Sequence, residues 1–159
     1  MESESEELLG KQIKLLNERH LHYKVIDCIR NNFAELVVVP GLGEMQTTAG
    51  LRIDAKKKGY TAGQPDILIL NQTSQYNGFA IELKTPKGDG EVSARQKDYL
   101  ERLRDLNYKT LISNDYDVIV IELTKFYMDL RFPCRCCSMV FKSKQTLNGH
   151  LNAWHAKET

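Results

Sequence analysis

The 159-residue chain lacks a long apolar run, since its longest uncharged hydrophobic stretches are LVVVP and ILIL. A bilayer-spanning helix needs about 18 such residues or more, so we expect no membrane insertion. The first ten residues, MESESEELLG, are acidic, whereas a secretory signal is basic and then apolar. We therefore expect an intracellular protein that is neither membrane-bound nor secreted.

Cysteine is scarce, and its placement argues against a disulfide framework. Cys134, Cys136 and Cys137 fall within four residues, and Cys28 is the only other cysteine. Such crowding is typical of metal binding in a reducing compartment. Cys28 lies on the apolar face of a predicted helix, where we expect a small buried side chain.

The chain also lacks an excess of charge of either sign. Its 22 Lys+Arg and 21 Asp+Glu leave a net charge of +1, so total charge does not indicate a nucleic-acid partner. The distribution is uneven, because residues 1–7 carry four acids and no base while residues 131–159 carry five bases and one acid. This segregation favours an anionic partner for the C-terminal segment.

Hydrophobic periodicity predicts an α/β plan with a small central sheet. The predicted elements are a helix over 11–32, a strand over 35–39, a short helix over about 50–58, strands over 66–70 and 79–84, a helix over 93–106 with Ser93 as N-cap, a strand over 106–113 and a segment over 117–130 for which helix is favoured over strand. The chain thus divides into an acidic tip (1–10), an α/β domain (11–130) and a tail (131–159). The tail is too short to form a stable core without an additional cross-link such as a bound metal ion.

The tail carries a C-x2-C-x12-H-x4-H pattern formed by Cys134, Cys137, His150 and His155. Two thiolates and two imidazoles at this spacing are typical of tetrahedral Zn²⁺, and a closed four-ligand site is structural rather than catalytic. Phe141 and Leu147 lie where a ββα finger needs its two apolar core residues. Cys136 is a spare cysteine that is not assigned as a metal ligand.

The tail resembles two-cysteine, two-histidine zinc fingers, yet its base-facing positions carry no strong base-reading side chains. Those positions are Ser143, Gln145, Thr146 and Gly149. None is Arg or Lys, so we do not expect sequence-specific reading of bases. We expect Lys142 and Lys144 to contact the DNA backbone, with a protein contact as the alternative.

Two carboxylates and a lysine form the main candidate for chemistry. Strand side chains alternate, so Glu82 and Lys84 share one face of the strand over 79–84. Asp66 begins the preceding strand and would converge with Glu82 if the two strands are adjacent. Paired carboxylates suit Mg²⁺, and a neighbouring lysine can orient or deprotonate water and stabilise charge developing on phosphorus. The P-D-x15-E-x-K pattern therefore predicts metal-assisted phosphodiester hydrolysis, whereas E-x-K alone fits an ordinary solvated ion pair.

These residues resemble the motif of the PD-(D/E)xK nuclease superfamily, and the flanking sequence is similar to the virus-type replication-repair nuclease (VRR-NUC) domain. The shared features are Lys58-Gly59-Tyr60, a G-x-P-D step at 63–66, an ELK strand at 82–84 and S-x-x-Q at 93–96. The resemblance covers about residues 15–129 and leaves the finger outside it. It implies a restriction-endonuclease-like fold, with a small mixed sheet flanked by helices.

The resemblance also assigns roles at the site. Asp66 and Glu82 would bind Mg²⁺ or Mn²⁺, with the main-chain carbonyl of Leu83 as a further ligand. Lys84 would be the catalytic lysine. Gln96 would support the site from the following helix.

The family places another glutamate on its first helix. Glu18 is the best match, and Glu35 is the rival. His22, one turn on from Glu18, would face the same way.

Two sets of cations lie near the motif. Lys87 and Arg95, close to the catalytic strand, are candidates for contacts with backbone phosphates. The run 56–58, with Arg52, is either a solvated face or a further phosphate-binding surface, and the sequence leaves both open.

By resemblance, the chain would be a Mg²⁺- or Mn²⁺-dependent DNA endonuclease of replication, repair or recombination. Members of this type cut branched DNA such as Holliday junctions or flaps, and a homodimer would make paired cuts. The alternative is a catalytically inactive nucleic-acid-binding module, against which the intact Asp66, Glu82 and Lys84 set counts. A finger on a viral-type nuclease implies a eukaryotic host or its large DNA viruses, with action in the nucleus or at a cytoplasmic viral replication site.

Overall fold

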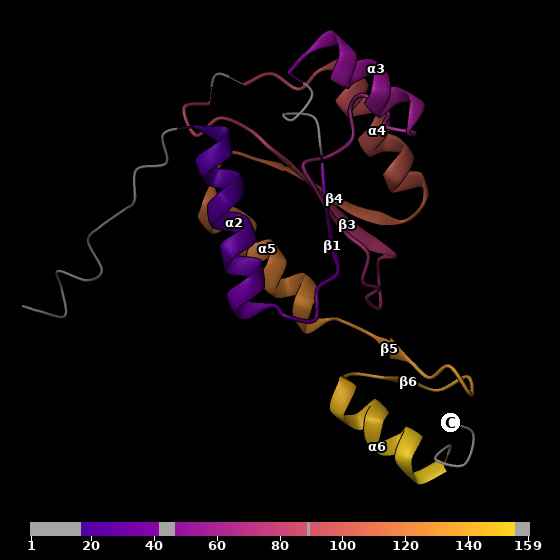
Figure 1. The fold of residues 1–159 in the computed structure, drawn as a ribbon. Coiled ribbons are helices and arrows are strands. Elements are labelled where there is room, and N and C mark those ends of the chain that lie inside the picture. The colour runs from indigo at the N-terminus through magenta and orange to yellow at the C-terminus, as the bar shows by residue number, and fades with distance from the viewer. Residues whose placement is uncertain (1–16, 42–46, 89, 155–159) are drawn as a thin grey trace, which may run out of the picture.

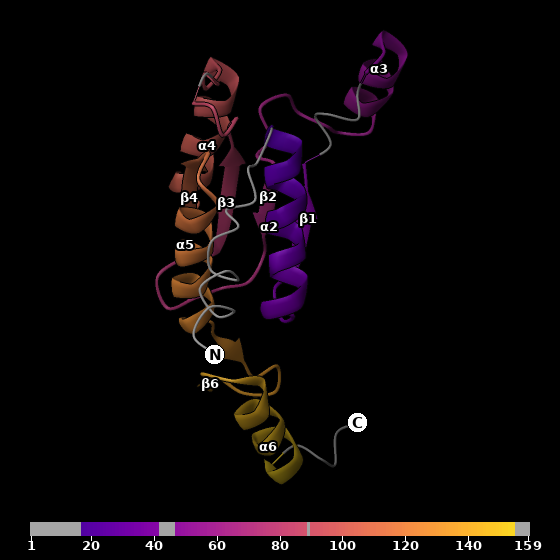
Figure 2. The same ribbon diagram turned by 90° about the vertical axis from the view of Figure 1, so that its left-hand side faces the viewer.

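The computed structural model describes residues 17–41, 47–88 and 90–154. The elements in chain order are α2 (Glu18–Asn32), β1 (Val38–Pro40), α3 (Ala49–Lys57), β2 (Ile67–Ile69), β3 (Gly78–Leu83), α4 (Ala94–Asp105), β4 (Tyr108–Ser113), α5 (Tyr116–Met128), β5 (Phe132–Pro133), β6 (Val140–Phe141) and α6 (Lys144–Trp154). Figures 1 and 2 show an α/β domain followed by a small C-terminal unit made of β5, β6 and α6. In the described ranges, no helix has the length and apolar character needed to cross a membrane.

The α/β domain is built on a four-stranded sheet with the order β1-β2-β3-β4. β1 pairs with β2, and β2 with β3, in antiparallel fashion, whereas β3 and β4 are parallel and are connected through α4. All six residues of β3 are buried, as befits a central strand with helices on both sides. The prediction of a small mixed sheet flanked by helices is therefore confirmed.

Helices cover the two faces of this sheet (Figure 1). Alternation along β3 decides which of its side chains meets which helix. On one face, Phe79 and Ile81 pack in a core that α2 and α5 complete. On the other face, Ala80 packs against Leu100 and Leu103 of α4. Full burial of a large apolar side chain stabilises the fold by roughly 1.5–3 kcal/mol. Glu82 belongs to the α4 face, because it alternates with Ala80.

The helices follow the sequence prediction closely. The predicted helices over 93–106, about 50–58 and 117–130 are confirmed as α4, α3 and α5. The predicted helix over 11–32 is α2, while residues 11–16 lie outside the described residues. Cys28 is buried on the core-facing side of α2, as expected.

The first strand was predicted too early. Residues 34 and 35 form a turn, in which the Leu36 N–H donates to the Phe33 carbonyl at 3.0 Å. The Asn71 side chain then binds the Glu35 carbonyl and the Val37 N–H, at 2.9 and 2.7 Å. These contacts hold the segment out of the ladder, so pairing begins only at β1. The boundaries of the other strands differ from the prediction by two residues or fewer.

The connection between the α/β domain and the C-terminal unit is held by contacts with the main core and with the β2–β3 connection. Leu130 is buried in the main core and forms a β-bridge with Thr73. The Arg131 N–H donates to the Gln72 carbonyl at 3.0 Å, and the Asp129 carboxylate accepts from the Ser74 N–H at 3.0 Å. These partners lie in the β2–β3 connection, so the unit is fastened at the end of the sheet where β3 begins.

Candidate functional site

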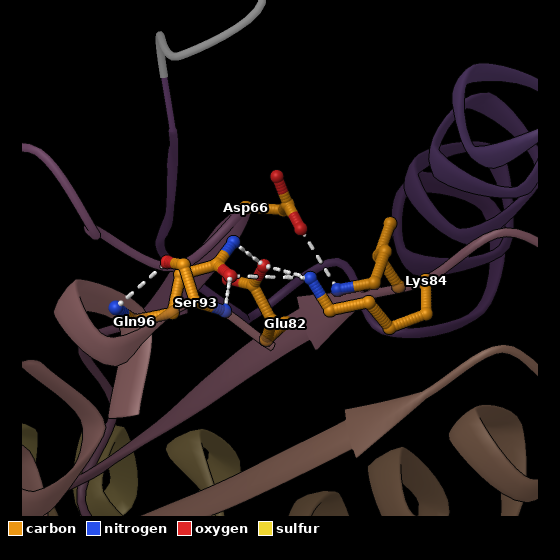
Figure 3. A network of polar contacts seen from close by, with 6 residues as sticks. Asp66, Glu82, Lys84, Ser93 and Gln96 are labelled. Atoms are coloured by element: carbon orange, nitrogen blue, oxygen red, sulfur yellow. Dashed lines mark hydrogen bonds and ion pairs between the residues drawn. The ribbon is translucent and has the colours of Figure 1, made fainter. Parts of the chain in front are cut away.

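The two motif carboxylates meet where β3 ends. β2 and β3 are adjacent and antiparallel with Ile67 opposite Ile81, and one further step of this register places Asp66 opposite Glu82. The Leu83 N–H donates to Oδ2 of Asp66 at 2.8 Å, which orients that carboxylate (Figure 3). The strands are therefore adjacent, as the predicted convergence of the carboxylates required.

Lys84 and Gln96 converge on the same carboxylate from two different elements. Nζ of Lys84 lies 3.0 Å from Oε1 of Glu82 and 3.3 Å from Oε1 of Gln96. Nε2 of Gln96 also donates to Oε1 of Glu82 (Figure 3). Glu82, which is only 2% exposed, therefore has one of its oxygens bound by two donors.

Gln96 is held in place by the start of α4. The N–H of Gln96 donates to Oγ of Ser93 at 3.3 Å, and the N–H of Ser93 donates to Oε1 of Gln96 at 2.8 Å. This reciprocal pair is a capping box, so the S-x-x-Q sequence both begins the helix and aims an amide at the site. The predicted N-cap Ser93 is confirmed.

Glu82 is electrostatically unusual. Its burial, and next the charge of Asp66, raise the pKa of Glu82 to about 7, with a further contribution from Glu18, while Lys84 opposes the rise. Oε2 of Glu82 is buried and has no hydrogen-bond partner among residues 17–41, 47–88 and 90–154. A buried carboxylate oxygen of this kind is unfavourable unless a cation lies against it. The donor set of carboxylates around it is the one that hard divalent cations prefer, so these residues fit such an ion.

An open cavity of about 640 Å³ adjoins the cluster, and its lining includes Glu18, Tyr60, Gly63, Asp66 and Arg95. Glu18 is the first residue of α2, where the Asn17 side chain caps the helix by accepting from the His20 N–H at 3.0 Å. The first helix therefore contributes a carboxylate to the same cavity as the sheet.

A glycine allows the cavity wall to close on α4. Gly63 has a φ of +96°, and a Cβ there would lie 2.4 Å from the Arg95 carbonyl oxygen. Only glycine fits this backbone at this approach. This close approach and the positive φ explain why the first position of the G-x-P-D step is a glycine.

The structure does not bring every candidate to this cavity. Glu35 lies in the turn after α2 and accepts a hydrogen bond from the Tyr127 hydroxyl, so the rival to Glu18 is not at the site. His22 lines a separate groove of about 740 Å³ along α2 and is not among the residues that line this cavity. Lys87 is exposed in the turn after β3 and is not among the residues that line the cavity.

Sequence reasoning gave no role to two residues of the cavity wall, Tyr60 and Gln64. Nε2 of Gln64 donates to the Tyr99 hydroxyl at 3.4 Å, which links the wall to α4. Both lie inside stretches already noted for resemblance, the Lys58-Gly59-Tyr60 step and the G-x-P-D step. Their location within these two stretches was the one sequence signal that could have identified Tyr60 and Gln64.

A second cluster lies in the C-terminal unit. The ligand atoms of Cys134, Cys137 and His150 all lie within 4.8 Å of one another, with Sγ of Cys137 3.4 Å from Nε2 of His150. His155, the predicted fourth ligand, lies outside the described residues. Phe141 packs its ring 4.9 Å from that of His150. Cys136 is not in the group, in line with its interpretation as a spare.

The fold and the carboxylate–lysine cluster together define a class of protein, a nuclease of the restriction-endonuclease-like superfamily. The chain belongs to the VRR-NUC domain family, whose model matches residues 11–114, more than half of the 159 residues. The C-terminal unit lies outside this match.

One solved structure, described as a VRR_NUC domain protein, shares the fold. It is 21% identical, with a TM-score of 0.57 over 71% of this chain and 89% of that chain. No curated protein matches the chain. The likeness at this identity concerns the fold, and the residues of the site stand on their own geometry.

We predict that, without Mg²⁺ or Mn²⁺, the free energy of unfolding decreases as pH rises from 5.5 to 7.5. The ordinary pKa of a glutamate side chain, 4.5, applies to Glu82 in the unfolded chain, whereas burial raises the pKa of Glu82 to about 7 in the folded protein. In this window the folded state therefore binds the extra proton, and rising pH favours unfolding, by about 2 kcal/mol. Urea unfolding at the two pH values measures the slope.

Glu82→Gln should remove this slope and stabilise the metal-free protein at pH 7.5. Glu122→Gln is the matched control, because hydrogen bonds from Lys109 and Lys125 lower the pKa of Glu122 and it stays ionised throughout the window. That control should keep the slope. An unchanged slope in Glu82→Gln would contradict the electrostatic description of the site.

Proposed function

We propose that the chain is a DNA endonuclease that depends on Mg²⁺ or Mn²⁺. The observation that carries this proposal is the buried Glu82, which lies with Asp66 and Lys84 beside an open cavity. Its Oε2 has no hydrogen-bond partner in the part of the chain that the structure describes. Asp66, Glu82 and the Leu83 carbonyl would hold the ion, and Glu18 would complete the acidic set. A bound divalent ion supplies Lewis-acid polarisation of the phosphate and a more acidic water.

The protein's own residues supply positioning and charge. Lys84 is 12% exposed and is held by Glu82 and Gln96, so its ammonium is placed before substrate arrives. From there it can orient the attacking water and stabilise negative charge that develops on phosphorus. Gln96 acts as a positioning residue for both Glu82 and Lys84. Arg95 in the cavity wall and Lys87 beyond β3 would contact flanking phosphates.

We further propose that the substrate is branched DNA, a four-way junction or a flap, and that a homodimer makes paired cuts. The support is that each chain carries one Asp66–Glu82–Lys84 set, which suffices for one strand at a time. The C-terminal unit would be a zinc finger with Zn²⁺ on Cys134, Cys137, His150 and His155. Lys142 and Lys144 of this unit are exposed and available for backbone contacts.

We propose that the enzyme acts in processes that produce branched DNA, namely replication, repair and recombination. We propose an intracellular site of action, the host nucleus or a cytoplasmic viral replication site. The support is the resemblance to a viral-type nuclease combined with the finger pattern.

The test is cleavage of a panel that contains a four-way junction, a flap, a splayed arm and a plain duplex, each with Mg²⁺, with Mn²⁺ and with neither. We expect metal-dependent incision that is strongest on the branched substrates. Binding without incision of any member, with either metal, would favour the alternative of an inactive nucleic-acid-binding module.

We predict that Asp66→Asn lowers cleavage at low Mg²⁺ by roughly 100-fold, because the amide is a weaker ligand than the carboxylate. Raised Mn²⁺ should restore part of the activity. Single-turnover rates across a metal titration measure both effects. Asp105→Asn, at the exposed far end of α4, is the control and should behave like the unsubstituted chain. Full activity of Asp66→Asn at low Mg²⁺ would show that Asp66 is not a ligand.

A further inference from the structure

Helix α3 lacks the packing that stabilises α2, α4 and α5, the other helices described in the α/β domain. None of its residues is buried, and Leu51 and Ile53 are 48% and 57% exposed. Figure 2 shows α3 projecting away from the sheet and from α2. The described part of the chain therefore supplies no apolar surface that accounts for this helix.

The internal stabilisation of α3 is small. Thr48 caps the helix by accepting from the Leu51 N–H at 3.2 Å, and Asp54 pairs with Lys58 at 2.7 Å on the surface. An exposed pair of this type contributes roughly 0.3–0.5 kcal/mol. Isolated helices shorter than about 12 residues are marginal in water. A nine-residue helix in this position is thus expected to need a partner.

The charge of the segment indicates the chemistry of that partner. Arg52 and the run 56–58 give four positive charges against Asp54, a net +3 over residues 49–58. The chain that follows α3 leads directly to Tyr60 and Gly63 in the wall of the catalytic cavity. An anionic partner bound by α3 would therefore lie beside the cavity.

We infer that α3 is a DNA-binding arm, which contacts backbone phosphates of the duplex next to the cleaved phosphodiester and becomes a stable helix on contact with it. This inference rests on the proposed function, since it assigns a further binding surface for the same substrate. It also favours the phosphate-binding interpretation of the run 56–58 over a solvated face.

A second copy of the chain is a poorer occupant. A two-fold contact through α3 would place the same surface on both partners and bring two +3 segments together. A stable dimer also buries about 800 Å² per partner, which a single nine-residue helix with two large apolar side chains does not offer. A DNA duplex is the better partner, because its negative charge is opposite to that of α3.

The test measures binding of a branched duplex in the absence of divalent metal, so that the substrate is not cut. Lys56→Gln/Lys57→Gln removes two charges at nearly unchanged helix propensity. Lys24→Gln/Lys125→Gln removes the same charge from α2 and α5. We expect the α3 variant to raise the Kd at least tenfold and to reduce the slope of log Kd against log salt by about 2. The control should change the Kd less than twofold.

Hydrogen exchange tests the coupling to helix formation. The amides of α3 should exchange freely in the chain alone and become protected when the duplex is added. Ala55→Pro keeps every charge but interrupts the helix, so it should weaken binding as well.

Three results would overturn the inference. Binding by the α3 variant that matches the control would show that these cations do not contact DNA. Protection of α3 in the absence of DNA that grows with protein concentration would assign the helix to a second copy. If the unsubstituted chain binds and cuts DNA normally while hydrogen exchange of the α3 amides does not change on DNA binding, this inference alone is refuted. If the unsubstituted chain does not bind DNA at all, the proposed function is refuted as well.

Discussion

Replacing Lys84 with Ala should reduce the rate of DNA cleavage by roughly 100- to 10,000-fold while DNA binding changes less than twofold. The ammonium is placed by two acceptors, Oε1 of Glu82 at 3.0 Å and Oε1 of Gln96 at 3.3 Å. Its main work is to stabilise charge that exists only in the transition state, so the loss should fall on the chemical step. Single-turnover cleavage at saturating substrate separates this step from binding.

Lys109→Ala is a matched control for this prediction. Lys109 is also mostly buried, at 17% exposure, and its Nζ lies 2.6 Å from a carboxylate oxygen of Glu122. It lies on β4, opposite Phe79 rather than at the end of β3 where the cluster lies. Lys109→Ala should therefore retain cleavage when folded. Turnover by Lys84→Ala at the rate of the unsubstituted chain would overturn the assignment of the active site.

The second large effect concerns the C-terminal unit, where Cys137→Ala should unfold residues 131–159 and leave the α/β domain assembled. Cys134 is the only buried residue among 131–154, so this unit has almost no apolar core. The proposed Zn²⁺ would therefore supply most of its stability. Leu130, in contrast, is packed in the main core. Hydrogen exchange should show loss of protection in α6 with α2 and α5 unchanged.

Catalysis should persist in part in this variant. The C-terminal unit is fastened at the β2–β3 connection, while the carboxylate–lysine cluster lies at the other end of β3. Six strand residues span about 20 Å, so loss of the unit should not reach the cluster. Weaker binding or an altered preference among branched substrates should be the main defect.

Cys136→Ala is the internal control, because Cys136 lies one position away and outside the ligand group. It should retain bound zinc, protection of α6 and full activity. Loss of zinc in Cys136→Ala would show that the ligand assignment is wrong. A Cys137→Ala protein that is folded and binds Mg²⁺ normally, yet cuts no substrate, would show that the C-terminal unit is part of the active site.

Local features of the sequence were sufficient to predict most elements and the central part of the site. Alternation along 79–84 placed Glu82 and Lys84 together, and S-x-x-Q at 93–96 marked both the start of α4 and Gln96. Such signals span only a few residues, because strand alternation and helix capping depend on the nearest backbone groups. For the same reason they could be seen without knowledge of the fold.

Only the tertiary structure decided between residues whose roles depend on distant partners. Glu18 and Glu35 carry the same side chain, but the structure places the first at the cavity and the second beside Tyr127. The positions of whole elements decide that Oε2 of Glu82 lacks a partner among the described residues and that α3 is exposed. They also decide that Leu130 pairs with Thr73. Contacts of this kind join residues far apart in the chain, so no local pattern records them.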